Sequence, residues 1–514
     1  MSIKRTILLI IFLLVSFSSS SADEKSIGKV KSASENWRSQ QGLVILNDFR
    51  DLLSMPNVAS NLQDMAKNAD WIESYIAKRG FKFQRLEAGG APYIYAELNQ
   101  PGASKTVLIY AHFDGQPVNL SNWSSSPWQP QLRDNLVEAG GKDVSWPTAA
   151  NQIKEHWRLF ARSSGDDKAP VIALMAAIDA LKSEGINRSV NIKLILDGEE
   201  EAGSPTLEKL LDKYAELLKA DLMLFCDGPM HQSRQRQLVF GVRGTIGLNL
   251  TTYGPSRPLH SGHYGNWAPN AAEQMIAALD SIHDENGRIA IQDYYLDVRQ
   301  MTEEEKRAIS VMPEMDAQLK KDLVIAESRL KDTRVEEAIM QPAAVITGVE
   351  VGSTRDKARN VLVPQAHASI NFRLVANQQP TKVRQLVENH FRQQGYYVIN
   401  ELASEKVRSQ HSKVLSLMWE KSGYPAFRSS LESAEAIKLS NILSHLEGDK
   451  PLMTPTMGGS LPIYLFEKAL NIPIIILPVA NHDNNQHGPN ENLRIKNLWE
   501  AIDVYAAVLA EFGK

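Results

Sequence analysis

Acidic and histidine side chains follow the ends of four apolar stretches of this sequence, and a further acid precedes a helical pattern. The residues concerned are His112 with Asp114, Glu200 with Glu201, Asp227, His482 or His487, and Asp166. Imidazole nitrogens and carboxylate oxygens suit Zn²⁺, and less often Mn²⁺ or Co²⁺. Two histidines with several acids are enough for a pair of ions that share one carboxylate. The sequence therefore indicates a two-ion metal site, if the fold brings these residues together.

The apolar stretches themselves predict buried strands of a parallel sheet. They are Lys105–Ala111, Ile192–Leu196, Asp221–Cys226 and Ile472–Val479. Helical patterns alternate with them at Pro170–Ser183, Pro205–Lys219 and Ile495–Phe512. This alternation predicts the α/β class with a largely parallel sheet. Open sheets of this class collect their chemistry at the carboxyl ends of the strands, so the candidate ligands should meet there.

The pattern changes near Leu238. Leu238–Tyr253 and Val361–Leu374 alternate as antiparallel strands with one solvated face do, and Asn270–Ile282 is helical. We therefore predict a main domain in two parts, 23–236 and 378–514, with a second, α+β domain inserted at 237–377. The second part of the main domain would begin with a helix at Pro380–Gln394. A chain of this length exceeds what one hydrophobic core supports, which favours two domains.

Residues 1–22 predict a secretory signal. Lys4 and Arg5 precede an apolar stretch, Ile7–Phe17, that is too short to span a bilayer, and a serine run ends at Ala22. Cleavage after Ala22 would place the protein in the periplasm of a Gram-negative cell, or outside the cell. An uncleaved anchor is the alternative. A bacterial lipid anchor is not expected, because no cysteine follows the apolar stretch.

The charge balance is mildly acidic. Two of the 56 Lys plus Arg lie in the signal, which leaves 54 against 60 Asp plus Glu and a net charge of −6. This balance does not indicate nucleic acid or an anionic membrane surface as a partner. The single cysteine, Cys226, excludes an internal disulfide framework, and its apolar neighbours favour a buried structural thiol.

Each candidate ligand also has a structural interpretation. An acidic run such as Glu199–Glu201 usually lies on a solvated face, and a lone histidine at a strand end is usually a satisfied structural group. A single residue of this kind would be weak evidence for a metal site. Five strand-end groups favour the metal site, because one sheet topology brings them together.

The order of the motifs resembles a known family, the co-catalytic dizinc metallopeptidases. The matching residues are His112-x-Asp114, Asp166-Asp167-Lys168, Glu200-Glu201-x-Gly203-Ser204, Asp227-Gly228 and the late His487. The family includes carnosinase, glutamate carboxypeptidase, aminoacylase and succinyl-diaminopimelate desuccinylase. The resemblance runs from about Val44 to the C-terminus. Residues 110–117 and the following Trp- and Pro-rich loop are most similar to the dipeptidase branch.

The resemblance implies a role for each site residue. One Zn²⁺ would be bound by His112 and Asp227, the other by Glu201 and His487, with Asp166 bridging both. Glu200 would be the general base that deprotonates the bridging water. Asp114 would contact the far ring nitrogen of His112 and fix its tautomer. Glu200 and Glu201 are expected on an extended strand exit, where neighbouring side chains point in different directions.

The inserted domain, 237–377, resembles the family's lid and dimerisation domain. His260, in Leu259–Gly262, would reach the active site of the partner chain in a homodimer and polarise the scissile carbonyl. Arg373, Gly459 and Ser460 would bind the substrate carboxylate. The alternatives are a loop-capping role for His260 and an ordinary surface position for Arg373.

Three segments depart from the family pattern. Ala161-Arg162-Ser163 replaces Gly-Arg-Gly before the bridging aspartate, and Thr456-Met457 replaces Arg-Glu ahead of Gly458. Gln486 precedes the final histidine, in a stretch where an acidic residue is commoner. These positions would form substrate walls, so they bear on the choice of substrate more than on the metal site.

The sequence thus predicts a secreted zinc exopeptidase that hydrolyses dipeptides or short peptides with a free C-terminal carboxylate. It would hold two Zn²⁺ per chain, with Mn²⁺ or Co²⁺ as possible substitutes, form a homodimer, and have no stable membrane association after signal cleavage. An N-acyl amino acid deacylase is the alternative enzyme, because it also cleaves an amide beside a carboxylate. An inactive peptide-binding homologue and a metal-storage protein are the two non-enzymatic interpretations. Glu200 argues against the peptide-binding homologue, and His260 and Arg373, which serve no metal, argue against the storage protein.

Overall fold

The computed structural model describes residues 2–421 and 423–514, with side chains from Glu24 onward. By its internal contacts the chain divides into two compact units. Unit 1 comprises Met1–Phe240, Ser429–Thr454 and Leu465–Lys514. Unit 2 comprises Gly241–Arg428 and Pro455–Tyr464.

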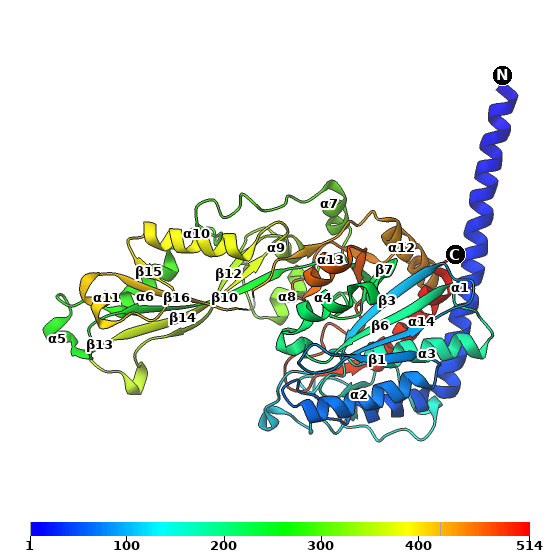
Figure 1. Ribbon diagram of the computed structural model, residues 1–514, viewed down its shortest axis with the longest axis horizontal. Helices are drawn as coiled ribbons and strands as arrows, with labels where there is room; N and C mark the ends of the chain where they lie inside the picture. Colours follow the sequence, from blue (N-terminus) through cyan, green and yellow to red (C-terminus); the bar gives the residue numbers. More distant parts are fainter. Residues whose placement is uncertain (1, 422) are drawn as a thin grey trace. The chain divides into compact units, whose positions relative to one another are not determined.

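Unit 1 is built on an eight-stranded sheet in the order β1-β2-β6-β3-β7-β19-β8-β18 (Figure 1). The strands are β1 (Lys82–Leu86), β2 (Tyr93–Leu98), β6 (Val190–Asp197), β3 (Lys105–His112), β7 (Leu222–Phe225), β19 (Ile474–Ile476), β8 (Gln237–Val239) and β18 (Leu452–Thr454). The four neighbours β6, β3, β7 and β19 run parallel. Strands β1 and β2 form an antiparallel edge. The predicted α/β class with a largely parallel sheet is therefore confirmed.

The strand register brings the predicted ligands level with one another. His112, the last residue of β3, is paired with Asp197, the last residue of β6. Tyr110 of β3 is paired with Phe225 of β7, so Asp227 follows its strand at the same height as His112. In β19, Ile476 is paired with Phe225 as well, and the chain then continues towards His487. These chain segments therefore all lie at the same end of the sheet, where the parallel strands have their carboxyl ends.

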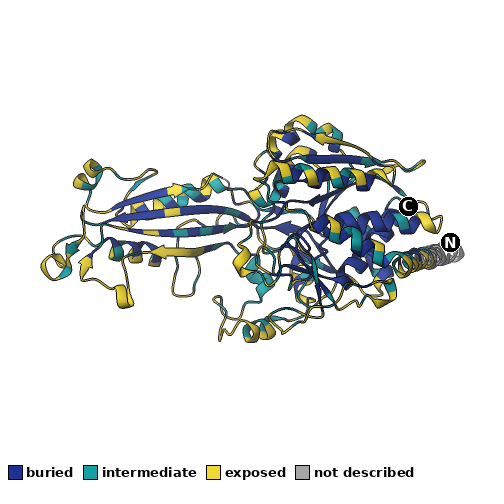
Figure 2. Cartoon of the chain, turned by 90° about the horizontal axis from the view of Figure 1, so that it is seen from below, coloured by how far each residue is buried: buried dark blue, intermediate teal, exposed yellow. Residues whose placement is uncertain are grey.

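Helices α3 (Ala169–Ser183) and α14 (Ile495–Glu511) pack against each other in unit 1. Most residues of both helices are buried, as the dark blue ribbons of Figure 2 show. This burial explains why α3 is apolar around nearly the whole helix, whereas α14 keeps a polar stripe at Lys496, Glu500 and Asp503. Pro170 is tolerated in the first turn of α3, where backbone N–H groups have no partner within the helix.

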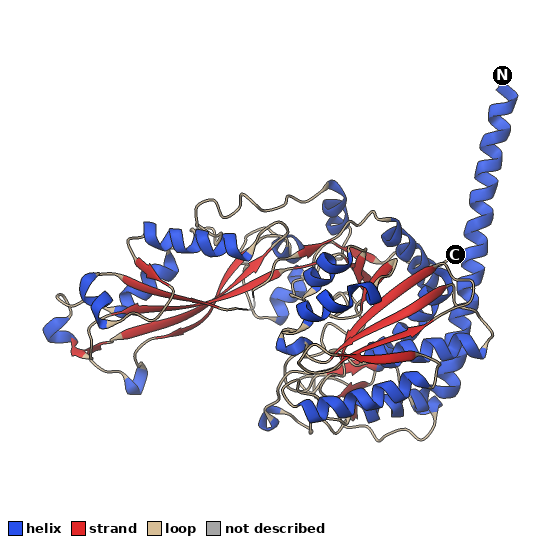
Figure 3. Cartoon of the chain, viewed as in Figure 1, coloured by secondary structure: helices blue, strands red, loops and turns tan. Residues whose placement is uncertain are grey.

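Unit 2 contains a five-stranded sheet in the order β12-β14-β10-β16-β15 (Figure 3). The strands are β12 (Ala343–Glu350), β14 (Gln365–Leu374), β10 (Gly244–Tyr253), β16 (Val414–Trp419) and β15 (Tyr397–Ile399). Helices α6 (Ala271–Asp280) and α10 (Pro380–Gln393) pack on one face, where their apolar side chains join those of β10 and β14 in a core. Alternate residues of the same strands, such as Asn249 and Asn371, lie on the other, more polar face.

Unit 2 differs in extent from the predicted insertion at 237–377. The helix predicted at Pro380–Gln394 is α10, and its residues Val383, Val387 and Phe391 lie in the core of unit 2. The sequence pattern alone places this helix in the main domain, and that assignment is wrong. Its amphipathic pattern shows that it covers an apolar face, but not which of the two sheets provides that face.

The backbone of helix α1 (Ser2–Leu53) runs through the predicted signal segment, 1–22, whose side chains lie outside the described residues. The secretory signal therefore stays a prediction. Farther along α1, residues such as Val30, Leu46 and Phe49 are buried in unit 1. In the described part of the chain, no helix has the length and apolarity that a membrane crossing requires.

Candidate metal centre

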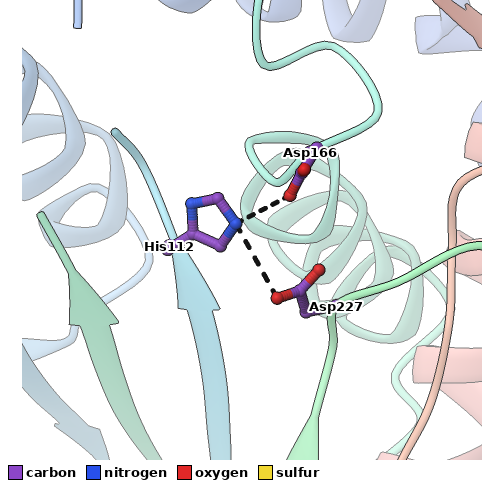
Figure 4. A group of neighbouring side chains, drawn as sticks. All are labelled: His112, Asp166 and Asp227. Carbon is purple, nitrogen blue, oxygen red and sulfur yellow. Dashed lines mark hydrogen bonds and ion pairs between the residues drawn. The ribbon is translucent and has the colours of Figure 1, made fainter. Parts of the chain in front are cut away.

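Three of the predicted ligands form one compact group. His112 leaves the end of β3, Asp227 follows β7, and Asp166 lies in the turn before α3. Nε2 of His112 lies 2.8 Å from Oδ1 of Asp166 and 3.8 Å from Oδ2 of Asp227 (Figure 4). All three side chains are buried, and their ligand atoms lie within 4.8 Å of one another.

A second group shares Asp166 with the first. Nε2 of His487 lies 3.1 Å from Oδ2 of Asp166 and 3.2 Å from Oε2 of Glu201. Asp166 thus offers one carboxylate oxygen to each group. The structure therefore brings together all five residues predicted as metal ligands, in the two sets that the resemblance implies. His482, the other candidate after β19, lies in neither group.

The three glutamates of the acidic run have three different environments. Glu199 is buried and accepts hydrogen bonds from the N–H groups of Ala91 and Thr206 and from the Tyr93 hydroxyl, so it is a structural residue. Glu201 belongs to the second group. The Glu200 carboxylate accepts no hydrogen bond from any residue that the structure describes. Its pKa is nevertheless affected by His112, Asp227, Glu201 and Asp166, so it lies close to both groups.

Asp114 positions both the histidine and the glutamates. Its Oδ1 lies 3.3 Å from Nδ1 of His112, on the side of the ring away from Asp166. The same carboxylate accepts the backbone N–H groups of Glu200 and Glu201, each at 3.0 Å. These two residues begin a short 3₁₀ helix, η3 (Glu200–Ala202), and not the predicted extended exit. The bonds to Asp114 hold that turn in place, and no local sequence pattern marks them.

Burial and mutual repulsion shift the pKa values of the acids. Burial raises the pKa of Glu201 to about 8 and that of Asp227 to about 6, and it raises the pKa of Glu200 well above its usual range. Burial also acts against ionisation of Asp166, but hydrogen bonds from His112 and His487 outweigh it and lower the pKa of Asp166. The hydrogen bond to Asp166 raises the pKa of His487 to about 9. A proton or a cation at the centre of the cluster is therefore favourable, because it offsets the repulsion between the acids.

The donor set fits a divalent cation. Oδ1 of Asp227 and Oε1 of Glu201 are buried and have no hydrogen-bond partner among the described residues. Burying such acceptors without a partner is costly, and a cation would satisfy them. Two imidazoles with carboxylate oxygens suit Zn²⁺, and Mn²⁺ or Co²⁺ less often. A raised pKa means that these carboxyl groups tend to keep a proton, and a metal ion replaces such protons when it binds. The raised pKa values and the unpartnered oxygens therefore both indicate a bound divalent cation.

Glu491 anchors the turn that carries Asp166, a role that the sequence did not reveal. Its carboxylate is fully buried and accepts the backbone N–H groups of Ser163, Gly165 and Asp166, each at 3.0 Å. Arg162 donates to it as well, from Nη1 at 2.6 Å. Arg162 is the residue that Ala161-Arg162-Ser163 shares with the Gly-Arg-Gly of the family pattern, so this contact to Glu491 comes from the unchanged position. Ser163, one of the two changed residues, contributes only its backbone N–H.

The predicted carboxylate-binding residues lie together in unit 2. Nη1 of Arg373, in β14, donates to Oγ of Ser460 at 2.7 Å. The backbone N–H of Arg243 donates to the carbonyl of Gly459 at 3.0 Å. The buried Arg243 guanidinium, which no sequence motif marks, has its pKa lowered to about 10 by burial and by the nearby Arg373 charge. Neither guanidinium forms an ion pair with an acid that the structure describes, and two such neighbouring guanidiniums suit an anionic group.

His260 lies in unit 2, at the end of β11 (Leu259–His260), and is exposed. Its Nδ1 accepts the backbone N–H of Gly262 at 3.1 Å, so it caps the short helix α5 (Ser261–Tyr264). The loop-capping role, the alternative interpretation of His260, is thus present. It leaves Nε2 of the exposed ring available for a further contact.

Comparisons with known proteins agree with this geometry. The family model described as "Peptidase family M20/M25/M40" matches residues 108–511. The "Cys-Gly metallodipeptidase dug1" of Schizosaccharomyces pombe is 25% identical over 487 residues, 90% of this chain and 94% of the relative. The human "Beta-Ala-His dipeptidase" is 25% identical over 431 residues, 82% of this chain and 78% of the relative.

A solved structure supports the same relationship. The M20 family metallo-carboxypeptidase Sso-CP2 of Sulfolobus solfataricus is 26% identical and superposes with a TM-score of 0.74, over 91% of this chain and 99% of that one. The match to the family model covers most of the sheet of unit 1 and its ligand residues, together with unit 2. The resemblance drawn from the motifs is confirmed, and the chain belongs to peptidase family M20/M25/M40.

Proposed function

We propose that the protein is a metal-dependent dipeptidase that hydrolyses the amide bond of dipeptides or short peptides with a free C-terminal carboxylate. The observation that carries this proposal is the pair of ligand groups joined through Asp166, with the Glu200 carboxylate close to both. The names of the relatives support the choice of substrate, since several are dipeptidases.

In this proposal, different residues of the chain bind the metal ions, transfer the proton and position the other groups. When bound, two Zn²⁺ ions, held by His112 with Asp227 and by Glu201 with His487, would polarise the scissile carbonyl and make water a better nucleophile. Glu200 accepts the proton of the attacking water and passes it to the leaving amine. Its raised pKa suits a group that must both take up and release a proton. Asp114 keeps His112 and the Glu200 turn in position.

Arg373 and Ser460 bind the substrate carboxylate in this proposal, and Arg243 and Gly459 support them. A planar guanidinium pairs with a carboxylate through two parallel hydrogen bonds, which fixes orientation as well as charge. We further propose that the protein is a homodimer in which His260 completes the active site of the partner chain. Secretion, with residues 1–22 as the signal, is also part of the proposal.

A hydrolysis screen tests the proposed reaction. The zinc-loaded protein is incubated with a dipeptide library and, in parallel, with N-acetyl amino acids, and the products are identified by mass. We expect dipeptides to be cleaved and the acetyl compounds to be poor substrates. Preferential cleavage of N-acetyl amino acids would favour the deacylase. Absence of turnover with zinc, manganese and cobalt would favour a binding protein that has lost catalysis.

A further inference from the structure

The polar face of the unit 2 sheet holds a cavity that the proposed function leaves largely unused. Its volume is about 470 Å³. Its lining includes Gly247, Thr347, Ser369, Asn371, Arg373 and Glu420. It therefore carries a positive group, Arg373, and a negative group, Glu420, and all its lining residues belong to unit 2.

The Glu420 carboxylate lies directly over the strand β10. Its backbone N–H donates to the carbonyl of Gly247 at 2.9 Å. A Cβ atom at Gly247 would come within 2.1 Å of Cδ of Glu420, so the carboxylate occupies the space that a side chain at this position would take. Among the described residues, no cation forms an ion pair with it. Glu420 is thus held at the cavity without a partner of opposite charge.

The register of the sheet places the two charged residues at the same face. Gly247 of β10, over which the Glu420 carboxylate lies, is paired with Asn371 of β14, and Arg373 lies two residues farther along β14. Gly247 and Arg373 are therefore diagonal neighbours, with backbones about 7–8 Å apart. Arg373 and Glu420 both line the cavity. A lysine side chain, with four carbons between Cα and its ammonium, can extend from a carboxylate at Arg373 towards Glu420.

Asn371 supplies a further acceptor between the two charges. Its Nδ2 donates to Oγ1 of Thr245 at 3.1 Å, which leaves its Oδ1 facing away from that bond. Oδ1 is buried and has no hydrogen-bond partner among the described residues. An ammonium group has three donors and no acceptor, so a turn of the Asn371 amide towards the cavity would let it bond to Oδ1 of Asn371 and to the Glu420 carboxylate together.

We propose that this cavity selects substrates whose C-terminal residue has a cationic side chain, with Glu420 as the specificity-determining residue. The inference rests on the proposed function, because it places the substrate carboxylate at Arg373. The C-terminal side chain then lies along the polar face, and its ammonium meets Glu420 and Asn371.

Two substrates of equal length test the inference. Glycyl-lysine and glycyl-norleucine share a four-carbon stem, and only the first has an ammonium. For the zinc-loaded enzyme we expect kcat/KM to be about tenfold higher for glycyl-lysine, mainly through KM, because a partly exposed charged hydrogen bond has roughly this worth. In Glu420→Gln the preference should fall to within about twofold, while cleavage of glycyl-norleucine stays unchanged.

A charge reversal and a matched control sharpen the result. Glu420→Lys should favour glycyl-glutamate over glycyl-lysine. Glu401→Gln removes another exposed acid of unit 2, outside the cavity, and should keep the preference for glycyl-lysine. Equal kcat/KM for the two substrates in the wild type, or a lysine preference that survives in Glu420→Gln, would overturn the inference.

A binding measurement separates this inference from the proposed reaction. Free lysine and norleucine are titrated into the zinc-loaded protein by calorimetry. We expect lysine to bind about tenfold more tightly than norleucine, and Glu420→Gln to remove the difference. This result would support the cavity even if no dipeptide were cleaved. Equal binding of the two amino acids would refute it even in an active dipeptidase.

Discussion

The acidic run shows how one sequence motif distributes three carboxylates by their hydrogen-bond partners. Glu199 accepts several donors and stabilises the loop, and Glu201 faces His487. Glu200 has neither kind of partner in the described structure, although burial and the nearby acids raise its pKa. A carboxylate whose lone pairs accept no other hydrogen bond is free to accept a proton from a bound water. Glu200 is therefore the residue whose removal should affect chemistry more than structure.

The substitution Glu200→Gln tests this directly. It keeps the shape of the side chain and removes its ability to accept a proton. We expect kcat to fall by roughly 10²–10⁴, the usual contribution of a positioned general base, while zinc content and thermal stability stay close to wild type. Turnover and metal content are measured on the same sample. A turnover within a few-fold of wild type would contradict the assignment of Glu200 as the base.

Metal content tests the two ligand groups. The purified chain should bind up to two zinc ions, and a chelator should abolish activity, which added zinc restores. Because His487 and Glu201 belong to the second group only, the double variant His487→Ala/Glu201→Ala should retain one ion per chain. Elemental analysis against protein concentration measures both samples. Two ions in the double variant would show that these residues do not hold a metal.

At the scale of elements, the site depends on loops that distant acids hold in place. The turn before α3 is anchored by Glu491, which lies 325 residues farther along the chain than Asp166. The loop after β19 is anchored by Asp483, which accepts hydrogen bonds from Arg158 in β5 (Arg158–Phe160) and from Arg494 in β20 (Asn492–Arg494). The strands determine where along the sheet each ligand residue lies. The anchored loops determine which way its side chain points.

Glu491→Gln should weaken metal binding without removing any ligand. The amide keeps one acceptor but turns an NH₂ group towards the backbone N–H donors of the Asp166 turn, so the turn shifts. Loss of a group that orients a ligand typically costs 10- to 100-fold in metal affinity. A competition titration with a zinc chelator measures the affinity, and Glu35→Gln, at an exposed position, is the control. Unchanged affinity in a folded Glu491→Gln protein would contradict the anchoring role.

Asp483 should contribute to stability in a pH-dependent way. Burial raises its pKa, but the hydrogen bond and charge of Arg158 outweigh burial and lower it below the usual value. A lowered pKa in the folded state stabilises the protein at pH values above the unfolded pKa of about 3.9, and the effect is lost as the pH falls through the folded pKa. We expect Asp483→Asn to cost about 1–3 kcal/mol at pH 7.

Denaturant unfolding at a series of pH values tests this expectation. The difference in unfolding free energy between wild type and Asp483→Asn should stay constant from pH 8 to pH 5 and shrink below about pH 4. The exposed control Asp212→Asn should show little difference at any pH. A difference that is equally large at pH 3 would exclude the ionised carboxylate as its cause.

Much of the fold and the ligand set could be predicted because their signals are local. An apolar run followed by His112-x-Asp114 shows both the strand and its terminal ligand. The anchors could not be predicted, because the bonds of Glu491 to Ser163 and Asp166 join segments more than 300 residues apart. The 3₁₀ turn at Glu200 could not be predicted for the same reason, because it is held by Asp114, which follows a different strand. Local patterns also could not assign α10 to one core or the other.

At the scale of the whole molecule, the residues proposed for catalysis are divided between the two units. The metal ligands and Glu200 belong to unit 1, whereas Arg373, Ser460 and His260 belong to unit 2. In this proposal, activity requires residues from both units. A two-fold dimer is one way to supply His260, because each chain then offers the same residue to its partner. The dimer predicts that two different inactive variants restore activity when their subunits are mixed, which a monomeric enzyme would not show.

Complementation between two inactive variants tests the dimer. Homodimers of His260→Ala and of Glu200→Gln should each be nearly inactive. After subunit exchange about half of the dimers are mixed, and one of the two sites in each mixed dimer has both wild-type residues, so about a quarter of the wild-type rate should return. Differently tagged subunits verify the exchange, and sedimentation verifies the dimer. No rescue despite proven exchange, or a monomer at working concentration, would mean that His260 acts within its own chain or only caps α5.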